Sequence, residues 1–211
     1  FYEVHDLPRG TRFYRMLFRR IRLAIVTNRW KKRRIAELFS VPEAKLLYEP
    51  NAVDIESFSK VGSGMPLRKS YGIPEAAFLV GYAGSLRTMG MEKGIETLLG
   101  AMKMLGGNFK ALIIGGSKGD VNYYAEMAIG MEIEENIFFT GWVKYSSIPQ
   151  YLRACDVLVA PFPKTAHYNF YMSPMKIFEY MASGVPIVAS DLNSIREIVD
   201  DDSAFLVEPE N

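Results

Sequence analysis

The sequence has few of the residues on which several classes of protein depend. It contains one cysteine, Cys155, which excludes an internal disulfide and fits a reducing compartment. Its two histidines, His5 and His167, show neither zinc-ligand spacing nor a Ser-His-Asp order. No apolar run approaches the about 20 residues of a membrane-spanning helix, and no signal peptide is visible. We therefore expect a cytoplasmic globular protein.

The usual glycine motifs for phosphate binding are also missing. Residues 81–94 hold Gly84 and Gly94 together with two cations, Arg87 and Lys93. Neither G-x-G-x-x-G nor the P-loop pattern is present, which argues against a dinucleotide cofactor and against an ATPase. Small residues let a ligand approach the backbone, and the two cations could neutralise phosphates. A surface loop with solvated cations explains the same residues equally well.

Acidic residues are absent from positions 7–36, although the whole chain has a net charge of only +1. Residues 1–36 carry 11 Lys and Arg against two acidic residues, whereas residues 37–211 carry 14 against 22. The basic stretch 9–34 also has apolar residues at helical spacing, which suits peripheral contact with an anionic membrane. Solvated faces of ordinary helices are the plainer interpretation. Nothing besides charge indicates nucleic acid, and we expect none as a partner.

Hydrophobic periodicity predicts an α/β fold. Nearly continuous apolar strands separated by helices indicate a parallel sheet covered on both faces, a doubly wound domain with ligands at the carboxyl ends of its strands. The predicted strands are 1–6, 24–27, 44–49, 78–84, 109–116, 137–141, 156–161, 186–191 and 204–208. The predicted helices are 11–25, 29–39, 94–105, 122–131, 146–155, 174–183 and 194–199, and residues 65–74 are predicted as linker.

The segment 172–191 reads as a short helix followed by a buried strand. Ser173 is a good N-cap, Pro174 suits the first helical position, and Gly184 ends the helix. Lys176 and Glu179 share one face near the N-terminal end, where free N–H groups and the helix dipole favour an anion such as a nucleotide diphosphate. An amphipathic helix with a solvated Lys/Glu face is the alternative.

Other residues at predicted strand ends are candidates with weaker signals. Gly115 could let a base or ribose lie against the backbone, or merely allow a turn. Trp142 could line a nucleotide pocket, although core packing is the better single interpretation. His5 could orient a substrate or be structural. The run of carboxylates at 200–202 is typical of a solvated turn, and we predict no metal site.

The ordered segments resemble the retaining GT-B glycosyltransferases of family 4. The resemblance extends along nearly all the chain and rests on E-V-H-D, P-N-A-V-D, Y-A-G-S-L-R, E-K-G-I-E-T-L-L, L-I-I-G-G, T-G-W-V, Y-L-R-A-C-D-V-L-V-A-P, K-I-F-E-Y-M-A-S-G-V-P-I-V-A-S-D and R-E-I-V. No single segment is specific, but their order and spacing are.

The resemblance implies a two-domain GT-B enzyme of Rossmann-like α/β domains. Residues 1–50 would be the C-terminal part of the acceptor-side domain, 51–74 a linker, and 75–211 the nucleotide-sugar-binding domain without its last helices. We therefore expect a piece of a longer protein, inactive by itself. The resemblance further implies a hexose donor, UDP- or GDP-sugar, and a glycan or lipid-linked acceptor, with no cofactor.

The resemblance also assigns roles to individual residues. Arg87 and Lys93 would grip the diphosphate, and Glu179 would bind ribose hydroxyls. His5 matches a histidine near the transferred sugar and the acceptor. Ser173 and Lys176 fit an S-P-x-K variant of the family's E-x7-E motif, and Tyr171 replaces the first Glu of that motif, which usually touches the sugar.

The mechanism that the resemblance implies is transfer with retention and without a metal, in which cations and a helix N-terminus stabilise the leaving diphosphate. A scaffold of GT-B type that binds a nucleotide sugar or a membrane without catalysis is the alternative, and the departure at Tyr171 motivates it.

Overall fold

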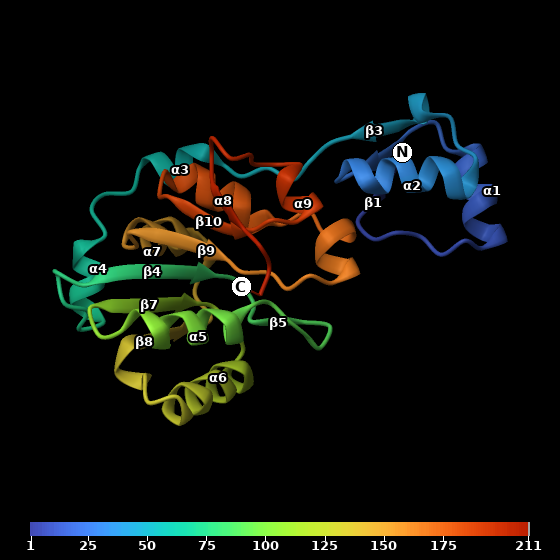
Figure 1. The fold of residues 1–211 in the computed structure, drawn as a ribbon. Coiled ribbons are helices and arrows are strands. Elements are labelled where there is room, and N and C mark those ends of the chain that lie inside the picture. Colours follow the sequence, from blue (N-terminus) through green and yellow to red (C-terminus); the bar gives the residue numbers. More distant parts are fainter. Residues whose placement is uncertain (211) are drawn as a thin grey trace.

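The computed structural model describes residues 1–210, which form two parallel sheets with their helices (Figure 1). The larger sheet has six strands in the order β11-β10-β9-β4-β7-β8, all paired in parallel. Its strands are β4 (Phe78–Ala83), β7 (Phe109–Ile114), β8 (Ile137–Gly141), β9 (Val157–Ala160), β10 (Ile187–Ser190) and β11 (Phe205–Val207).

The order of these strands reverses next to β4. The first three strands of this sheet in chain order, β4, β7 and β8, extend toward one edge, and the last three, β9, β10 and β11, extend toward the other. In such a sheet, a ligand site is expected where the order reverses, outside the carboxyl ends of the strands. The predicted doubly wound α/β fold is therefore confirmed, and the switch point lies between β4 and β9.

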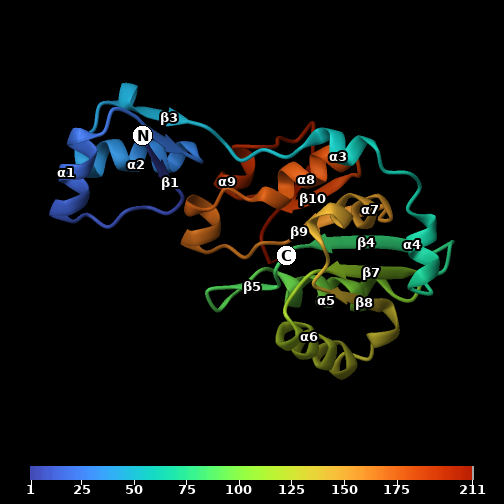
Figure 2. The same cartoon turned by 180° about the vertical axis from the view of Figure 1, so that it is seen from behind.

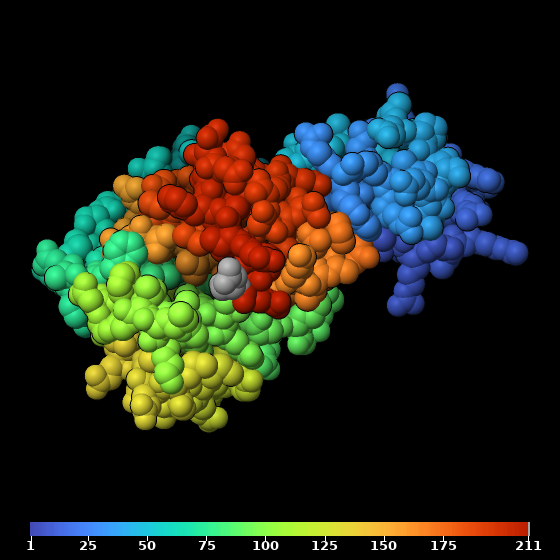
Figure 3. All heavy atoms as spheres, viewed as in Figure 1, coloured from blue at the N-terminus to red at the C-terminus, as the bar shows by residue number. Residues whose placement is uncertain are grey.

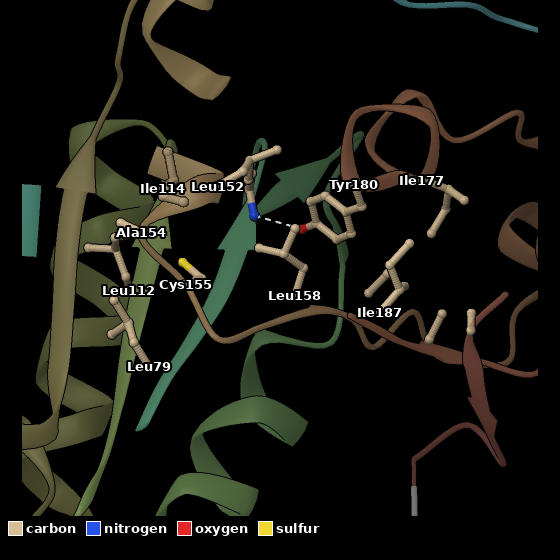
Figure 4. Packing of buried hydrophobic residues seen from close by; sticks show 14 of the residues in the cluster. Leu79, Leu112, Ile114, Leu152, Ala154, Cys155, Leu158, Ile177, Tyr180 and Ile187 are labelled. Atoms are coloured by element: carbon tan, nitrogen blue, oxygen red, sulfur yellow. Dashed lines mark hydrogen bonds between the residues drawn. The ribbon is translucent and has the colours of Figure 1, made fainter. Parts of the chain in front are cut away.

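Helices cover both faces of the larger sheet (Figures 1 and 2). Because successive side chains of a strand point to opposite faces, β4 and β7 divide their apolar residues between two cores. One core lies under α5 (Ile95–Leu105) and α6 (Lys118–Gly130). The other lies under α7 (Ile148–Arg153) and α8 (Met175–Ser183), where Tyr180 packs with Leu158 and Ile187 (Figure 4).

The smaller sheet has the order β1-β2-β3 and is parallel as well. Its strands and helices are β1 (Tyr2–Val4), α1 (Arg12–Arg20), β2 (Ala24–Val26), α2 (Arg29–Phe39) and β3 (Leu46–Tyr48). Phe18 and Phe39 stack in its own apolar core. This unit stands at one side of the molecule and meets the remainder at the segments that follow β9 and β10 (Figure 3).

Helix α8 differs from its prediction. It begins at Met175, and Pro174 occupies the cap position without a side-chain cap, so the predicted N-cap role of Ser173 is wrong. The predicted stop is confirmed, because Gly184 adopts a left-handed conformation with φ of 68°. The alternative of a solvated Lys/Glu face is also wrong, since Lys176 is 7% exposed.

Other helix boundaries differ from their predictions, because local capping or tertiary packing determines where the helix begins or ends. α6 begins four residues before its predicted start, because the Ser117 hydroxyl accepts a hydrogen bond from the Asp120 backbone N–H. The helix predicted over 11–25 ends at Arg20. Residues 55–70, which lie within the predicted linker 51–74, contain α3 (Ile55–Ser59) and α4 (Met65–Ser70). The helix predicted over 194–199 is the short α9 (Asn193–Arg196). Elements that were not predicted include the hairpin β5 (Arg87–Thr88) and β6 (Met91–Glu92) and the π-helical turn His167–Tyr171.

Candidate functional site

Two adjoining pockets open at the carboxyl ends of β4, β7 and β9. The first, of about 370 Å³, is called the cationic pocket here because both Lys93 and Lys176 line it. The second, of about 610 Å³, is called the aromatic pocket because Trp142 and Tyr145 line it. The pockets share four lining residues, Ala83, Gly84, Ser85 and Glu179. A ligand with a charged end and an apolar end could therefore lie across both.

Lys176 is the most unusual group in the cationic pocket. Its ammonium nitrogen Nζ lies 3.5 Å from the centre of the Tyr82 ring and 4.8 Å from that of Phe162. The nitrogen is buried and has no hydrogen-bond partner among the described residues. Burial, and then the charge of Lys93, lower the pKa of Lys176 well below its usual range. A buried amine without a partner is costly, and an anion in this pocket could supply that partner.

Lys93 supplies a second cation to the same pocket. Its Nζ donates a hydrogen bond of 2.7 Å to the Ser85 hydroxyl, and burial lowers its pKa. The following residue, Gly94, has φ of 87°, and a Cβ there would lie 1.7 Å from the carbonyl oxygen of Pro161. Only glycine fits this position, and it starts α5 directly after the lysine. The packing of the loop therefore fixes the place of Lys93.

Glu179 lies where the two pockets join. Burial raises the pKa of its carboxyl group, and a hydrogen bond with Tyr145 and the charge of Lys176 act in the opposite direction. A carboxylate in this place can accept hydrogen bonds from hydroxyl groups of a ligand that passes from one pocket to the other.

Arg87 lines the aromatic pocket, whereas Lys93 lines the cationic pocket. Its guanidinium lies 4.2 Å from the centre of the Tyr123 ring, and its Nε donates a hydrogen bond of 3.4 Å to the Tyr124 hydroxyl. The hydrogen bond with Tyr124 is the main reason that the pKa of Arg87 is raised. The structure thus assigns the two predicted diphosphate cations to different walls.

Two glycines let the backbone form the floor between the pockets. Gly115 has φ of 105°, and a Cβ there would lie 2.5 Å from the carbonyl oxygen of Gly84. A larger residue at either strand end would fill the space into which a ligand could settle. Trp142 stands at the rim of the aromatic pocket with 77% of its surface exposed, so its preferred interpretation as a core residue is wrong.

The two histidines are placed differently from each other. The side chain of His5 is exposed, and its Nε2 lies 3.5 Å from a carboxylate oxygen of Glu3. His5 is not one of the described residues that line either pocket. His167 lines the cationic pocket instead. Burial lowers its pKa, and Asp6 acts in the opposite direction. Sequence reasoning missed His167, because it lies in a turn without hydrophobic period.

Ser173 lines the cationic pocket, and its carbonyl accepts a hydrogen bond of 2.7 Å from the side chain of Asn51. The P-N-A-V-D segment thereby supports the pocket wall. The two linings also include residues that sequence reasoning did not single out, among them Ser85, Thr88, Phe162, Tyr168 and Tyr145. In residues 1–210, no group of three or more His, Cys, Asp or Glu side chains is placed to share a metal ion. No helix in the same range is long and apolar enough to span a bilayer.

Comparison with known proteins places this architecture among sugar-transferring enzymes. The chain is 27% identical over 198 residues to the lipopolysaccharide core biosynthesis mannosyltransferase LpsB of Rhizobium meliloti. This alignment covers 90% of the present chain and 51% of LpsB. It is 30% identical over 163 residues to the phosphatidyl-myo-inositol mannosyltransferase of Mycolicibacterium smegmatis, and the alignment covers 76% of the present chain and 38% of that relative. The chain spans about half the length of the curated relatives it matches.

A solved structure gives the same result at the level of the fold. The crystal structure of Anabaena HepE in complex with UDP and glucose superposes with a TM-score of 0.74 at 21% identity, over all of this chain and 58% of HepE. The fold is therefore of the GT-B type. The family described as Glycosyl transferases group 1 matches residues 77–211, the larger sheet and both pockets. The chain belongs to the family of glycosyl transferases group 1.

Proposed function

We propose that this protein transfers a hexose from a UDP- or GDP-sugar to a glycan or lipid-linked acceptor, with retention of configuration and without a metal ion. The observation that carries the proposal is the buried ammonium of Lys176, which has no hydrogen-bond partner among residues 1–210 and lies in a pocket that joins an aromatic one. A nucleotide-diphosphate sugar has the matching shape, because its charged diphosphate separates an aromatic base from a polar sugar.

The donor would lie across both pockets. The base would lie against Trp142 in the aromatic pocket, and the ribose hydroxyls would donate to Glu179 at the junction. The diphosphate would then reach Lys93 and Lys176, and the sugar would occupy the remainder of the cationic pocket. The HepE structure contains UDP and glucose, which supports a donor of this class.

The chemistry follows from where charge develops. Cleavage of the bond between sugar and phosphate leaves negative charge on the diphosphate, which Lys93 and Lys176 would stabilise as it forms. A ligand phosphate next to Lys176 would also raise the pKa that burial lowers and so favour the protonated amine. Because the cations are supplied by the protein, we expect turnover to be indifferent to EDTA.

Retention is supported by the small number of carboxylates in the pocket. Among the described residues that line the cationic pocket, Glu179 is the only one with a carboxylate. If Glu179 holds the ribose, no second carboxylate remains there as a covalent nucleophile. The acceptor would then attack on the face that the diphosphate leaves, and the departing phosphate oxygen would take the acceptor's proton.

Helix α1 supports a membrane-bound or lipid-linked acceptor. Phe13 and Met16 are 61% and 48% exposed on its outer face, while Phe18 on the opposite face is buried. Arg12, Arg19 and Arg20 lie at helical spacing around the two apolar residues. We propose that this face rests on an anionic bilayer at the cytoplasmic side. Two relatives named for lipopolysaccharide core and phosphatidyl-myo-inositol glycosylation support such an acceptor.

Titration calorimetry with UDP and GDP tests donor binding, on the wild type and on Lys93→Ala and Glu179→Ala. We expect one nucleotide to bind, and each substitution to weaken it about tenfold or more through the loss of a charge-assisted hydrogen bond. Binding that ignores both substitutions would overturn the assignment of the site. Turnover of a nucleotide sugar by the full-length protein separates the enzyme from a non-catalytic scaffold.

Cosedimentation with vesicles tests the membrane face. Wild-type protein should sediment with phosphatidylglycerol vesicles and not with phosphatidylcholine vesicles, and Phe13→Ser with Met16→Ser should release it. Met104→Ser, at an exposed methionine on α5, is the matched control. Equal binding of both variants would contradict a role for the outer face of α1.

A further inference from the structure

The first turn of α2 holds the segment that lines the sugar end of the cationic pocket. Asn28, 3% exposed, caps this helix: its Oδ1 accepts a hydrogen bond of 2.7 Å from the Lys31 backbone N–H. The same side chain donates from Nδ2 to the carbonyl oxygens of Phe170 and Met172, both at 2.9 Å. One buried amide therefore joins the smaller sheet to the turn 167–172.

Glu197, directly after α9, makes a second connection to the same helix start. Its two carboxylate oxygens accept hydrogen bonds from the backbone N–H groups of Arg29, at 2.7 Å, and Trp30, at 3.1 Å. N–H groups in the first turn of a helix have no partner within the helix, and the helix dipole favours a negative charge there. A carboxylate from the larger unit thus satisfies donors of the smaller one.

Trp30 adds an aromatic contact at this joint. Its ring stacks on Phe170 with centroids 5.5 Å apart and meets the edge of Tyr171 at 4.9 Å. In two opposite views, the start of α2 faces the turn between β9 and α8 (Figures 1 and 2). Hydrogen bonds and ring packing therefore converge on one turn of five residues, His167–Tyr171.

The other side of that turn belongs to the cationic pocket. His167, Tyr168, Met172 and Ser173 line it, next to Lys93. None of these four lines the aromatic pocket, whose walls come mainly from the ends of β4 and β7, the segments that follow β4, β7 and β8, and Glu179 on α8. A displacement of the turn would change the pocket at the sugar end and leave the nucleoside end in place.

The same helix start also fixes the loop that carries His5 and Asp6. Lys31 is buried, and its Nζ donates to the His5 carbonyl oxygen at 2.5 Å and to the Thr27 hydroxyl at 2.8 Å. The charges of Asp6 and Lys31 both reach His167. The first turn of α2 therefore holds two segments, one from each unit: the loop with His5 and Asp6, and the turn that lines the cationic pocket.

We propose that Asn28 and Glu197 form a clamp that positions His167 and its turn against the sugar of the donor. This rests on the proposed function, because it assumes that the sugar lies in the cationic pocket. Asn28 and Glu197 are positioning residues that do not touch the donor. His167 is the residue through which they act, as a hydrogen-bonding group for sugar hydroxyls.

Asn28→Asp tests the clamp with little change in shape. The carboxylate keeps the cap, since its oxygen still accepts from Lys31, but it loses both donors and places an oxygen against two carbonyl oxygens. Dissociation constants are measured for UDP, UDP-glucose, GDP and GDP-mannose. We expect the bare nucleotide to bind within about twofold of the wild type and its sugar nucleotide to bind about tenfold more weakly, the loss of at least one hydrogen bond. Glu197→Gln should act in the same direction, and Asn108→Asp, at the opposite end of the sheet, should change neither constant.

Two outcomes would overturn the clamp: equal weakening of nucleotide and sugar nucleotide by Asn28→Asp, or no change in either. A ligand-free readout keeps the clamp distinct from the donor site. The backbone amides of Arg29 and Trp30 should exchange hydrogen slowly in the wild type and about tenfold faster in Glu197→Gln. Fast exchange in the wild type refutes the clamp. Slow exchange without binding of any of the four nucleotides refutes the proposed function and not the clamp.

Discussion

Lys176→Met should make the protein more stable and a weaker binder at once. The native ammonium is buried and has no hydrogen-bond partner in the described part of the chain, and such a group costs about 1–3 kcal/mol. Its contact with the Tyr82 ring offsets part of that cost, by about 0.5–2 kcal/mol. Methionine fills a similar volume and packs well against aromatic rings. We therefore expect a net stabilisation of about 1 kcal/mol at neutral pH.

The pH dependence of this stabilisation has a definite sign. Burial lowers the pKa of folded Lys176 below the ordinary value of 10.5, so between the lowered pKa and 10.5 the unfolded chain holds the extra proton. The stability of the wild type therefore rises with pH across that window. The advantage of Lys176→Met should shrink as the pH approaches 10.5.

Thermal unfolding with and without UDP measures both effects. Without ligand, the midpoint of Lys176→Met should lie about 2–4 °C above that of the wild type, the shift expected for about 1 kcal/mol in a chain of this size. The affinity for the nucleotide diphosphate should fall about 10- to 100-fold, because a hydrogen bond to a charged group is lost.

Lys103→Met, at an exposed lysine of α5, is the matched control and should change neither quantity. A lower midpoint for Lys176→Met would show that the ammonium stabilises the fold, and an unchanged nucleotide affinity would show that it does not meet the ligand. Either result refutes the reasoning that connects its burial to anion binding.

Three further changes have expected outcomes. Asp156→Asn should lower the free energy of unfolding in urea by about 2–3 kcal/mol. In the wild type the buried guanidinium of Arg68 lies 2.8 Å from the Asp156 carboxylate, and the substitution removes this charge partner. A loss below about 0.5 kcal/mol would contradict this. Glu179→Gln should gain stability relative to the wild type between pH 4 and pH 7. Burial raises the pKa of the folded glutamate, so the stability that its protonated form contributes to the wild type is complete below pH 4.5 and is lost as the pH rises through the folded pKa. Equal differences in thermal midpoint between variant and wild type at both pH values would count against this. Gly94→Ala should destabilise the fold by about 2 kcal/mol or more, because its Cβ would meet the Pro161 carbonyl oxygen, and circular dichroism melts that match the wild type would disprove the close approach.

The strands of the larger sheet were predictable because each is a short apolar run between helical segments. Their order, and therefore the switch point, follows from pairing between distant strands and is not written in any local pattern. Of the predicted donor residues, those at strand ends, such as Gly84 and Gly115, lie in the pocket walls because parallel strands end at one edge of the sheet. Their roles in binding remain predictions.

The places where sequence reasoning differs from the structure have physical causes. Helical period assigned Lys176 to a polar face, but the rings of Tyr82, on β4, and Phe162, after β9, lie against its ammonium group. Trp142 was expected in the core, yet it follows a strand at the edge of the sheet and stays exposed. His167 lies on a π-helical turn in which the Phe170 carbonyl oxygen accepts a hydrogen bond from Asn28, a residue far away in the sequence. Each outcome depends on a tertiary contact that no local pattern contains.

A crystal structure of this protein with UDP or GDP, whichever binds, tests the central claim most directly. The account predicts that the diphosphate lies within hydrogen-bonding distance of Lys176 Nζ, the ribose beside Glu179, and the base in the aromatic pocket against Trp142. A nucleotide bound outside the two pockets, or one whose diphosphate leaves Lys176 without a partner, would contradict it.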